Sequence, residues 1–469
     1  MTARPGRLRA RPYNGAMRTL LLVAAVATLS IALVAPQAAL AAEPLPTSAA
    51  VAPDAALARL LEAARSDTLA MPRLQVLTDE IGARLAGSEA LVRATIWGEL
   101  AFRGDAQENV RHEKVMVPAW VRGRERLAML APQRRELAVL GLGGSVGTPG
   151  LEASVAVVHS FADLSPAVAG KIVLFDVPMS ADPPALQQYG KTAYVRAGAA
   201  ARAAEFGAVA ALVRSITAQS LYTPHTGSMQ YDERFPRIPA AAVTTEDAGW
   251  IDRLVSRGID VRLRLEMGAE TRPDAESANV LAEIVGSERP EEIVVVGGHL
   301  DSWDVGQGAH DDGVGIVHTI ETLRLIRALG LKPKRTIRAV LFTNEENGLR
   351  GGKAYAEAHG GERHVAAVET DLGGGRPVRW GATGTEEQLA FLRRAAAPLG
   401  IPVGDGGGAD ISPLKEKGVL LVGLYPEDEL YMAVHHTAAD TFDKVDPDDF
   451  RAGLAAVAGL VWRLANEPL

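Results

Sequence analysis

Residues 293–302 read Ile-Val-Val-Val-Gly-Gly-His-Leu-Asp-Ser. Four consecutive apolar residues are typical of a central strand that is covered on both faces. The two glycines end the strand and let the backbone bend, which brings the His299 imidazole close to a ligand. Because sites in open α/β sheets form outside the carboxyl ends of strands, this stretch predicts an α/β fold with His299 at the edge of a site.

The chain from residue 279 onward continues this pattern. Apolar residues between 314 and 329 recur at helical spacing. Asp446 followed by Pro447 is a favoured helix start. Three further apolar runs are predicted to be strands: Thr336–Thr343, Val365–Val368 and Leu420–Leu424. The alternation of predicted strands and helices along this part of the chain predicts an α/β domain.

Two pairs of adjacent acidic residues stand in this region. Asp311 and Asp312 precede the predicted helix, where one could bridge two cations while the other caps the helix, or both could act only as caps. Glu345 and Glu346 follow the strand that ends at Thr343, although paired acids on a loop are often only solvated. Two carboxylates at a buried strand end repel each other unless a cation or proton compensates. One is therefore expected to bind metal, and the other to face a water molecule as general base.

Asp371 and the pair His435-His436 complete the set. Asp371 follows the strand 365–368 and could instead be a turn residue. His435 and His436 cannot easily face the same way, so one is expected to be a ligand and the other to contact substrate or to pack. The sequence contains no cysteine, and carboxylates with imidazoles alone suit a catalytic zinc site with an open position. Two ions that share a bridging carboxylate would polarise a carbonyl and acidify a water molecule.

The N-terminus has a separate pattern that predicts export. Basic residues up to Arg18 precede an apolar run at 20–34, and small residues at 39–41 offer a cleavage site. This is typical of a secretory signal peptide over residues 1–41, although an uncleaved N-terminal anchor is the alternative. We therefore expect a periplasmic or secreted protein with no stable membrane insertion after cleavage. Without cysteines it has neither disulfides nor a lipidated cysteine.

The remaining chain divides into three parts. Residues 55–120 are mostly helical in pattern and residues 276–469 are α/β. Residues 121–275 alternate short β-prone runs with turns and one Ala-rich helix, which predicts an inserted α/β or β-rich domain. We expect no tight cluster of histidines and carboxylates in this block. The formal net charge of -8 argues against a nucleic-acid partner, which normally requires clustered basic residues.

Five motifs in a fixed order point to one family. They are Gly-Gly-His-Leu-Asp-Ser at 297–302, Gly-Ala-His-Asp-Asp-Gly at 308–313, Glu-Glu at 345–346, Asp371, and His-Thr-Ala-Ala-Asp-Thr at 436–441. With these motifs the sequence resembles the co-catalytic zinc aminopeptidase and glutamate-carboxypeptidase family over nearly all of its mature length. It is most similar to the carboxypeptidase Q branch, although His310 stands where eukaryotic members carry Met.

The resemblance implies a fold and a cofactor. The expected fold is α/β, with a three-layer αβα zinc-exopeptidase domain around a central mixed sheet, formed by residues 55–120 and 276–469. Residues 121–275 would be an inserted β-rich protease-associated domain that shapes access of the substrate and does no chemistry. Two Zn²⁺ ions are expected per subunit, and a homodimer is also expected.

The resemblance also implies a role for each candidate residue. His299 and Asp371 would hold one zinc ion. Glu346 and His436 would hold the other, and Asp311 would bridge the two ions. None of these five residues is replaced in the sequence.

Glu345 would be the general base and acid, and Asp301 would orient His299. These roles predict an exported di-zinc metallo-exopeptidase that hydrolyses dipeptides or short peptides. An aminopeptidase that acts on longer peptides is the alternative within the family. A non-catalytic receptor or binding protein is the alternative from another class, and the intact set of ligands argues against it.

Overall fold

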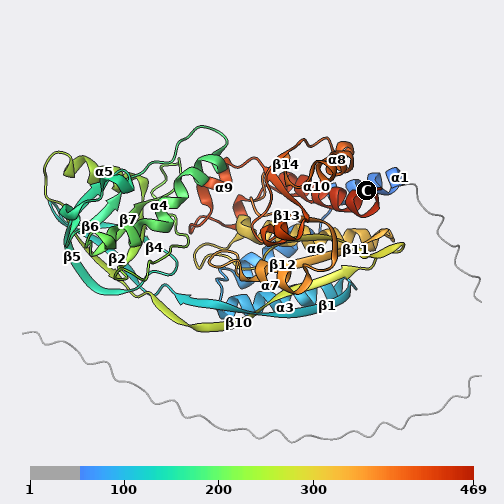
Figure 1. Cartoon of the computed structure of the whole chain (residues 1–469), viewed down its shortest axis with the longest axis horizontal. Helices are drawn as coiled ribbons and strands as arrows, with labels where there is room; N and C mark the ends of the chain where they lie inside the picture. Colours follow the sequence, from blue (N-terminus) through green and yellow to red (C-terminus); the bar gives the residue numbers. More distant parts are fainter. Residues whose placement is uncertain (1–52) are drawn as a thin grey trace, which may run out of the picture. The chain divides into compact units, whose positions relative to one another are not determined.

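The computed structural model describes residues 53–469, so the expected signal peptide at 1–41 lies outside the described residues. Two eight-stranded sheets organise this part of the chain (Figure 1). The first sheet has the order β1-β10-β12-β11-β13-β16-β14-β15. Its strands are β1 (Glu108–Val121), β10 (Glu270–Ile284), β12 (Arg335–Phe342), β11 (Arg289–His299), β13 (Arg363–Glu369), β16 (Leu420–Pro426), β14 (Pro377–Thr383) and β15 (Val403–Asp405).

The middle of the first sheet is parallel. β11 pairs in parallel with β12 and with β13, and β13 pairs in parallel with β16. The pairs β1 with β10, β10 with β12 and β14 with β16 are antiparallel, so the sheet is mixed, as expected. All four central strands match runs predicted from the sequence, and every residue of β12 is buried. The carboxyl ends of the four parallel strands lie along one edge.

Helices cover both faces of this sheet. Val294 and Val296 of β11 enter one hydrophobic core, whereas Ile293 and Val295 enter the core on the other face with Tyr355 of α7 (Arg350–His359). Alternate residues of one strand thus point to opposite faces. The three-layer αβα arrangement is confirmed. The helices of the first core are α1 (Pro53–Arg65), α3 (Glu89–Gly104), α6 (Val314–Ala328), α8 (Glu386–Ala396) and α10 (Pro447–Asn466).

Shorter helical segments connect these elements. They include α2 (Ala70–Gln75), η1 (Val76–Ile81), η4 (Ala309–Gly313), η6 (Ser412–Lys417) and α9 (Glu429–Val434). α2 and η1 follow each other directly and form part of the helical pattern predicted within 55–120. α10 begins as expected, because the Asp446 carboxylate accepts the N–H groups of Asp448 and Asp449.

Residues 125–267 form the second sheet, which has the order β3-β2-β9-β5-β6-β7-β8-β4. Its strands are β3 (Arg135–Leu137), β2 (Glu125–Ala131), β9 (Arg262–Met267), β5 (Thr148–Val158), β6 (Ile172–Phe175), β7 (Ala210–Arg214), β8 (Ala240–Val243) and β4 (Val139–Gly141). α4 (Ala185–Glu205) and α5 (Thr245–Val255) pack against it. α4 begins well before the Ala-rich run from which it was predicted. Its first turns carry Gln, Tyr and Lys residues and no apolar stripe, so the sequence pattern did not reveal them.

β1 and β10 connect the two sheets. They pair antiparallel from Glu108 opposite Glu283 to Val121 opposite Glu270. The chain therefore leaves the first sheet along β1 and returns along β10 (Figure 1). The second sheet lies within the block predicted as an insertion at 121–275. The exact boundaries of that block, and its assignment as a protease-associated domain, stay predictions.

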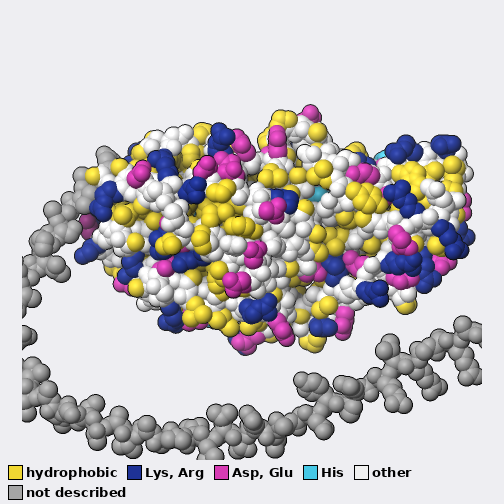
Figure 2. All heavy atoms as spheres, turned by 180° about the vertical axis from the view of Figure 1, so that it is seen from behind, with side chains coloured by type: hydrophobic (Ala, Val, Ile, Leu, Met, Phe, Trp, Pro, Cys, Tyr) yellow, Lys and Arg dark blue, Asp and Glu magenta, His cyan; other side chains and the backbone are white. Residues whose placement is uncertain are grey.

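The surface carries charges of both signs. On the face shown in Figure 2, Lys and Arg side chains alternate with Asp and Glu side chains over both ends of the molecule. Within residues 53–469, no helix combines the length and the apolar character that crossing a membrane requires.

Candidate active site

Four predicted site residues gather at the carboxyl ends of parallel strands. His299 is the last residue of β11, Glu345 and Glu346 follow β12, and Asp371 follows β13. Since these strands are parallel neighbours, their ends bring the four side chains to one edge of the sheet. Asp311 joins them from η4, the short segment that precedes α6.

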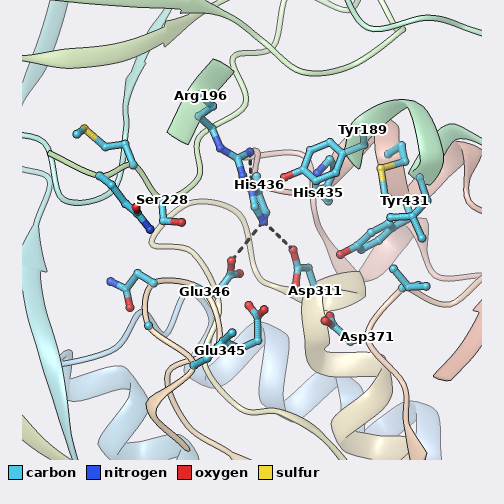
Figure 3. Close-up of a pocket in the computed structure, with 18 of the residues that line it drawn as sticks. Tyr189, Arg196, Ser228, Asp311, Glu345, Glu346, Asp371, Tyr431, His435 and His436 are labelled. Atoms are coloured by element: carbon cyan, nitrogen blue, oxygen red, sulfur yellow. Dashed lines mark hydrogen bonds and ion pairs between the residues drawn. The ribbon is translucent and has the colours of Figure 1, made fainter. Parts of the chain in front are cut away.

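Asp311 stands between two histidines. His299 Nε2 lies 3.1 Å from Asp311 Oδ1 and 3.1 Å from Asp371 Oδ1. His436, which follows α9, has its Nε2 3.4 Å from Asp311 Oδ2 and 3.2 Å from Glu346 Oε2 (Figure 3). The two carboxylate oxygens of Asp311 therefore face different histidines. A ligand that bridges two ions requires this arrangement.

These carboxylates lack the partners that a buried anion needs. Asp311 Oδ2 and Glu346 Oε1 are buried without a hydrogen-bond partner, and within the described residues Asp311, Glu346 and Asp371 have ion pairs with histidines only. Burying an unpaired charge is costly, so the group fits bound cations. Two overlapping triads, His299–Asp312–Asp371 and His299–Asp311–Glu346, have ligand atoms within 4.8 Å of one another. Imidazole and carboxylate donors without thiolates suit zinc.

Asp312 holds the main chain, although its carboxylate also belongs to the first of these triads. Its Oδ2 accepts the His299 N–H at 3.0 Å, and its Oδ1 accepts the Gly315 N–H at 3.0 Å. It therefore caps the first turn of α6 and leaves the bridging position to Asp311. Burial raises the pKa of Asp312 well above its ordinary value. Burial also opposes ionisation of Asp311, but the hydrogen bond to His299 and the nearby histidine charges hold the pKa of Asp311 below its ordinary value.

Glu345 and Glu346 take different positions although they are adjacent. Glu346 pairs with His436, whereas Glu345 lines the neighbouring cavity and pairs with no histidine among the described residues. Burial raises the pKa of Glu345 well above its ordinary value; His299 opposes this shift and neighbouring carboxylates add to it. A carboxylate of raised pKa takes up a proton more readily, which suits a proton acceptor beside a cavity.

Asp301 links His299 to Glu345. The Asp301 carbonyl oxygen lies 2.9 Å from His299 Nδ1, whereas the Asp301 carboxylate is 3.9 Å from that nitrogen. The closer partner of the imidazole is therefore the main-chain carbonyl, which leaves Nε2 to face the acidic residues. The Asp301 carboxylate accepts the Glu345 N–H at 3.1 Å. One residue thus positions both the imidazole and the candidate base.

His436 is held by the segment that carries the second sheet. Its φ of 61° lies in the left-handed region, which histidine seldom adopts. Its carbonyl accepts the Thr226 N–H at 2.9 Å, and its Nδ1 lies 3.2 Å from the Thr226 carbonyl. When Nδ1–H donates to Thr226, Nε2 is free to face Glu346. The expectation that the inserted part only shapes access is therefore too narrow, because this part also orients a candidate ligand.

Arg84 is a positioning residue that sequence reasoning missed. It lies in the loop between η1 and α3, and it is 0% exposed. It donates to the main-chain carbonyls of Leu300 at 2.6 Å, Gln307 at 2.9 Å and Gly308 at 3.0 Å. These bonds fix the loop between β11 and η4. No local pattern distinguishes this arginine from a solvated one, so only the tertiary structure reveals its role.

Asp440 holds the main chain of the bridging residue. Its carboxylate accepts the N–H groups of His310 at 2.8 Å and of Asp311 at 3.1 Å. Burial raises the pKa of Asp440 to about 7. Its place in the His-Thr-x-x-Asp-Thr motif is the sequence signal for this role. His310 Nδ1 accepts the Gly374 N–H at 3.1 Å, so this imidazole holds the main chain of the loop that follows Asp371.

The acidic residues open into a cavity of about 500 Å³. Tyr189, Arg196 and Ser228 from the inserted part line the same cavity (Figure 3). His435 packs beside it, with its ring centroid 5.1 Å from that of Tyr431 and 4.8 Å from that of Tyr189. Burial lowers the pKa of His435 well below its ordinary value. Of the two adjacent histidines, His435 packs between tyrosine rings and His436 faces the acidic residues.

The expectation of no histidine and carboxylate cluster in the inserted part is wrong. His159, Asp176 and Asp252 have ligand atoms within 4.8 Å of one another. They meet because β5 and β6 are parallel neighbours that end beside α5. Asp176 is already paired with Arg214 at 2.8 Å, and His159 is exposed, so this cluster is a surface ion-pair group.

Three comparisons with known proteins agree with this geometry. Residues 279–461 match the model of peptidase family M28. Carboxypeptidase Q from Xenopus laevis is 42% identical over 389 residues, which cover 80% of this chain and 81% of that protein. A peptidase M28 precursor from Shewanella amazonensis has a crystal structure that is 36% identical, with a TM-score of 0.85 over 89% of this chain and 98% of that one.

A more distant structure shares the fold. The zinc aminopeptidase from Bacillus subtilis has a TM-score of 0.63 at 20% identity, over 85% of this chain and 95% of that one. At that identity the likeness concerns the fold alone. The match extends over most of the described residues, so it includes the first sheet and most of the inserted part.

Proposed function

This chain belongs to peptidase family M28 and is a zinc-dependent exopeptidase, and from that premise we propose that it hydrolyses dipeptides or short peptides with two zinc ions. The observation that carries the proposal is the position of Asp311, whose two carboxylate oxygens face His299 and His436 separately. Glu345 lies beside this group, lines the cavity, and is the proposed general base.

The zinc ions, when bound, supply a Lewis acid for the scissile carbonyl and lower the pKa of the attacking water. Glu345 accepts a proton from that water and then passes it to the leaving amine. Its raised pKa supports the first step, because a carboxylate of higher pKa takes up a proton more readily. Asp301 keeps Glu345 in place through the main-chain N–H.

The size of the cavity supports short substrates. Tyr189, Arg196 and Ser228 of the inserted part line it together with the acidic residues, and its volume of about 500 Å³ lies within the range of small-molecule sites. Similarity to carboxypeptidase Q supports the same choice. An aminopeptidase on longer peptides is the alternative, and a non-catalytic receptor is the alternative from another class.

The test is release of amino acids from three kinds of substrate: free dipeptides, N-blocked dipeptides and aminoacyl anilides. Each is measured as purified, with a chelator, and after zinc is added back. We expect cleavage of free dipeptides that the chelator abolishes and zinc restores. Strong cleavage of anilides would favour the aminopeptidase. If no substrate is cleaved in a zinc-dependent way, the exopeptidase proposal fails and the receptor alternative gains.

Export is proposed from residues 1–41 alone, which lie outside the described residues. Cleavage after Ala41 would release a mature chain into the periplasm or the medium. Expression of the full chain in a bacterial host, followed by mass spectrometry of the exported fraction, tests this. A protein that keeps Met1 and stays with the membrane fraction would support the uncleaved anchor.

A further inference from the structure

Arg122 links the inserted part to the loop between β11 and η4. It follows the last residue of β1, where the chain passes from the first sheet to the second, and it is 9% exposed. Its Nε and Nη2 donate to the two carboxylate oxygens of Asp304 at 2.8 and 2.6 Å. Asp304 belongs to the loop that begins directly after His299. Two parallel hydrogen bonds of this kind fix the orientation of the guanidinium group as well as its charge.

The same guanidinium group also supports Thr226. Arg122 Nη1 donates to the Gly141 carbonyl, and Arg122 Nη2 lies 3.4 Å from Thr226 Oγ1. The Thr226 hydroxyl donates to the same Gly141 carbonyl at 2.7 Å. Thr226 is buried, so water does not replace these contacts if they are lost. The side chain of Thr226 is therefore held between a carbonyl and a cation whose position Asp304 fixes.

Thr226 in turn holds His436. The Thr226 N–H donates to the His436 carbonyl at 2.9 Å, and the Thr226 carbonyl lies 3.2 Å from His436 Nδ1. The left-handed φ of His436 is a conformation that persists only where the surroundings hold it. Figure 3 shows the imidazole of His436 directed at Glu346 and Asp311. Arg122 is thus connected to this candidate ligand through a single residue.

The His299 side of the metal group has supports of its own. His299 Nδ1 lies 2.9 Å from the Asp301 carbonyl oxygen. Arg84 donates to three main-chain carbonyls of the loop that follows β11. Both supports lie outside the inserted part, so loss of Arg122 should leave them in place. The two sides of the metal group therefore differ in how much they depend on the inserted part.

We propose that Arg122 is a positioning residue that fixes Thr226 and thereby sets the affinity for the zinc ion at His436 and Glu346. This inference rests on the two-ion function proposed above. It makes the contact between the inserted part and the loop after β11 a control on one of the two metal sites. Loss of a partner that orients a metal-binding imidazole typically weakens metal binding by about 10- to 100-fold.

The test counts the zinc ions and measures the affinity for each. Metal-free enzyme is titrated with zinc in competition with a chromophoric chelator. R122Q should bind one ion as the wild type does and the other about 10- to 100-fold more weakly. Its kcat for a free dipeptide should be low at limiting zinc and recover at excess zinc. R122K keeps the charge without the planar pair of donors, so its affinity should lie between those of R122Q and wild type.

Two further variants identify which ion is affected. E346Q removes a candidate ligand from the His436 side, so R122Q/E346Q should bind its remaining ion as tightly as E346Q does. D304N weakens the ion pair from the side of the loop and should weaken the same ion as R122Q, by a smaller factor. Glu125, whose carboxylate lies 3.6 Å from Arg122 Nη1, keeps a counter-charge beside the arginine in D304N.

Arg214 provides the matched control. It is also an arginine of the inserted part, and it pairs with Asp176 at 2.8 Å with 22% of its side chain exposed. R214Q removes an ion pair from the inserted part at a distance from Thr226 and should leave the affinity for both ions unchanged. Thermal unfolding of each variant shows whether the inserted part is still folded.

Three outcomes overturn the inference while leaving the two-ion function intact. The first is R122Q that binds both ions as tightly as wild type. The second is equal weakening of both ions in R122Q, or the same weakening in R214Q, since Arg122 would then support only the fold. The third is a loss of kcat in R122Q that persists when both ions are bound. If wild-type enzyme binds fewer than two zinc ions, the two-ion function fails and this inference falls with it.

Discussion

Glu345→Gln and Glu346→Gln are expected to have opposite effects on zinc content although the residues are adjacent. Glu346 Oε2 lies 3.2 Å from His436 Nε2. Four carboxylates line the cavity, those of Asp311, Glu345, Glu346 and Asp371. Of these four, only Glu345 has no ion pair with His299 or His436. Gln keeps the shape of either side chain, and the bond from Glu345 N–H to Asp301 belongs to the main chain. Glu345→Gln should therefore retain zinc, and Glu346→Gln should lose it.

The magnitude follows from the role of each carboxylate. Removal of a general base costs about 10²- to 10⁴-fold in turnover, which is about 3–5 kcal/mol of activation free energy. For Glu345→Gln this loss should fall on kcat. In Glu346→Gln the site at His436 keeps Asp311 as its remaining carboxylate. That set is smaller than the three protein ligands usual for catalytic zinc, so about one ion per chain should survive dialysis.

The two variants and wild-type enzyme are dialysed together, and zinc is measured by atomic absorption beside kcat for a free dipeptide. Thermal unfolding followed by circular dichroism shows that each variant is folded. The reasoning is refuted if Glu345→Gln loses an ion or keeps more than about a tenth of wild-type kcat. Full zinc content in Glu346→Gln would remove His436 and Glu346 from the proposed metal site.

Three further predictions concern the surroundings of the site. Arg84→Met should lower the free energy of unfolding, measured in urea, by about 3–5 kcal/mol. Three buried carbonyls lose their donor at about 1–3 kcal/mol each, and water replaces part of the lost hydrogen bonding. A decrease below about 1 kcal/mol would show that the loop between β11 and η4 does not depend on Arg84. Burial lowers the pKa of His318 to about 4. Between about pH 6.5 and pH 4 the unfolded chain therefore binds a proton at this histidine that the folded chain does not bind. The stability that is present above pH 6.5 is lost as the pH falls towards 4. Between pH 6.5 and 5, the free energy of unfolding of His318→Gln should fall by about 2 kcal/mol less than that of the wild type. The same dependence of the free energy of unfolding on pH in both proteins would contradict this. Gly227→Ala should lower the free energy of unfolding, because a Cβ there meets the Arg196 guanidinium at 2.2 Å and the φ of 140° is strained for alanine. Unchanged stability in urea would contradict this close approach.

The central strands and the candidate ligands could be predicted because their signals are local. A buried apolar run that ends in Gly-Gly-His or in Glu-Glu marks both a strand and its carboxyl end. Parallel pairing of β11 with β12 and β13 then brings these ends together without further information. Adjacent residues such as Asp311 and Asp312 could not be told apart in the same way. Their roles differ only through the N–H groups of His299 and Gly315 that Asp312 accepts.

The long pair of strands β1 and β10 could not be predicted from pattern. Each contains a proline, Pro118 in β1 and Pro273 in β10, and a proline argues against a regular strand. The structure places both prolines where the register shifts between Val117 and Ala119. The first half of β10 is also exposed, so it lacks the apolar alternation that marks a strand. These two strands nevertheless decide where the second sheet stands in relation to the site.

The inserted part reaches the candidate site through two residues, Thr226 and Arg196, and both of them contact His436. Thr226 holds the main chain and the Nδ1 of His436, which orients a candidate ligand. Arg196 donates to the same Thr226 carbonyl and lines the cavity. The carboxylates of the metal group come from the first sheet and its loops instead. The contacts that Asp301, Asp312 and Asp440 make with the main chain near the candidate ligands lie within the first sheet and its loops, apart from the inserted part.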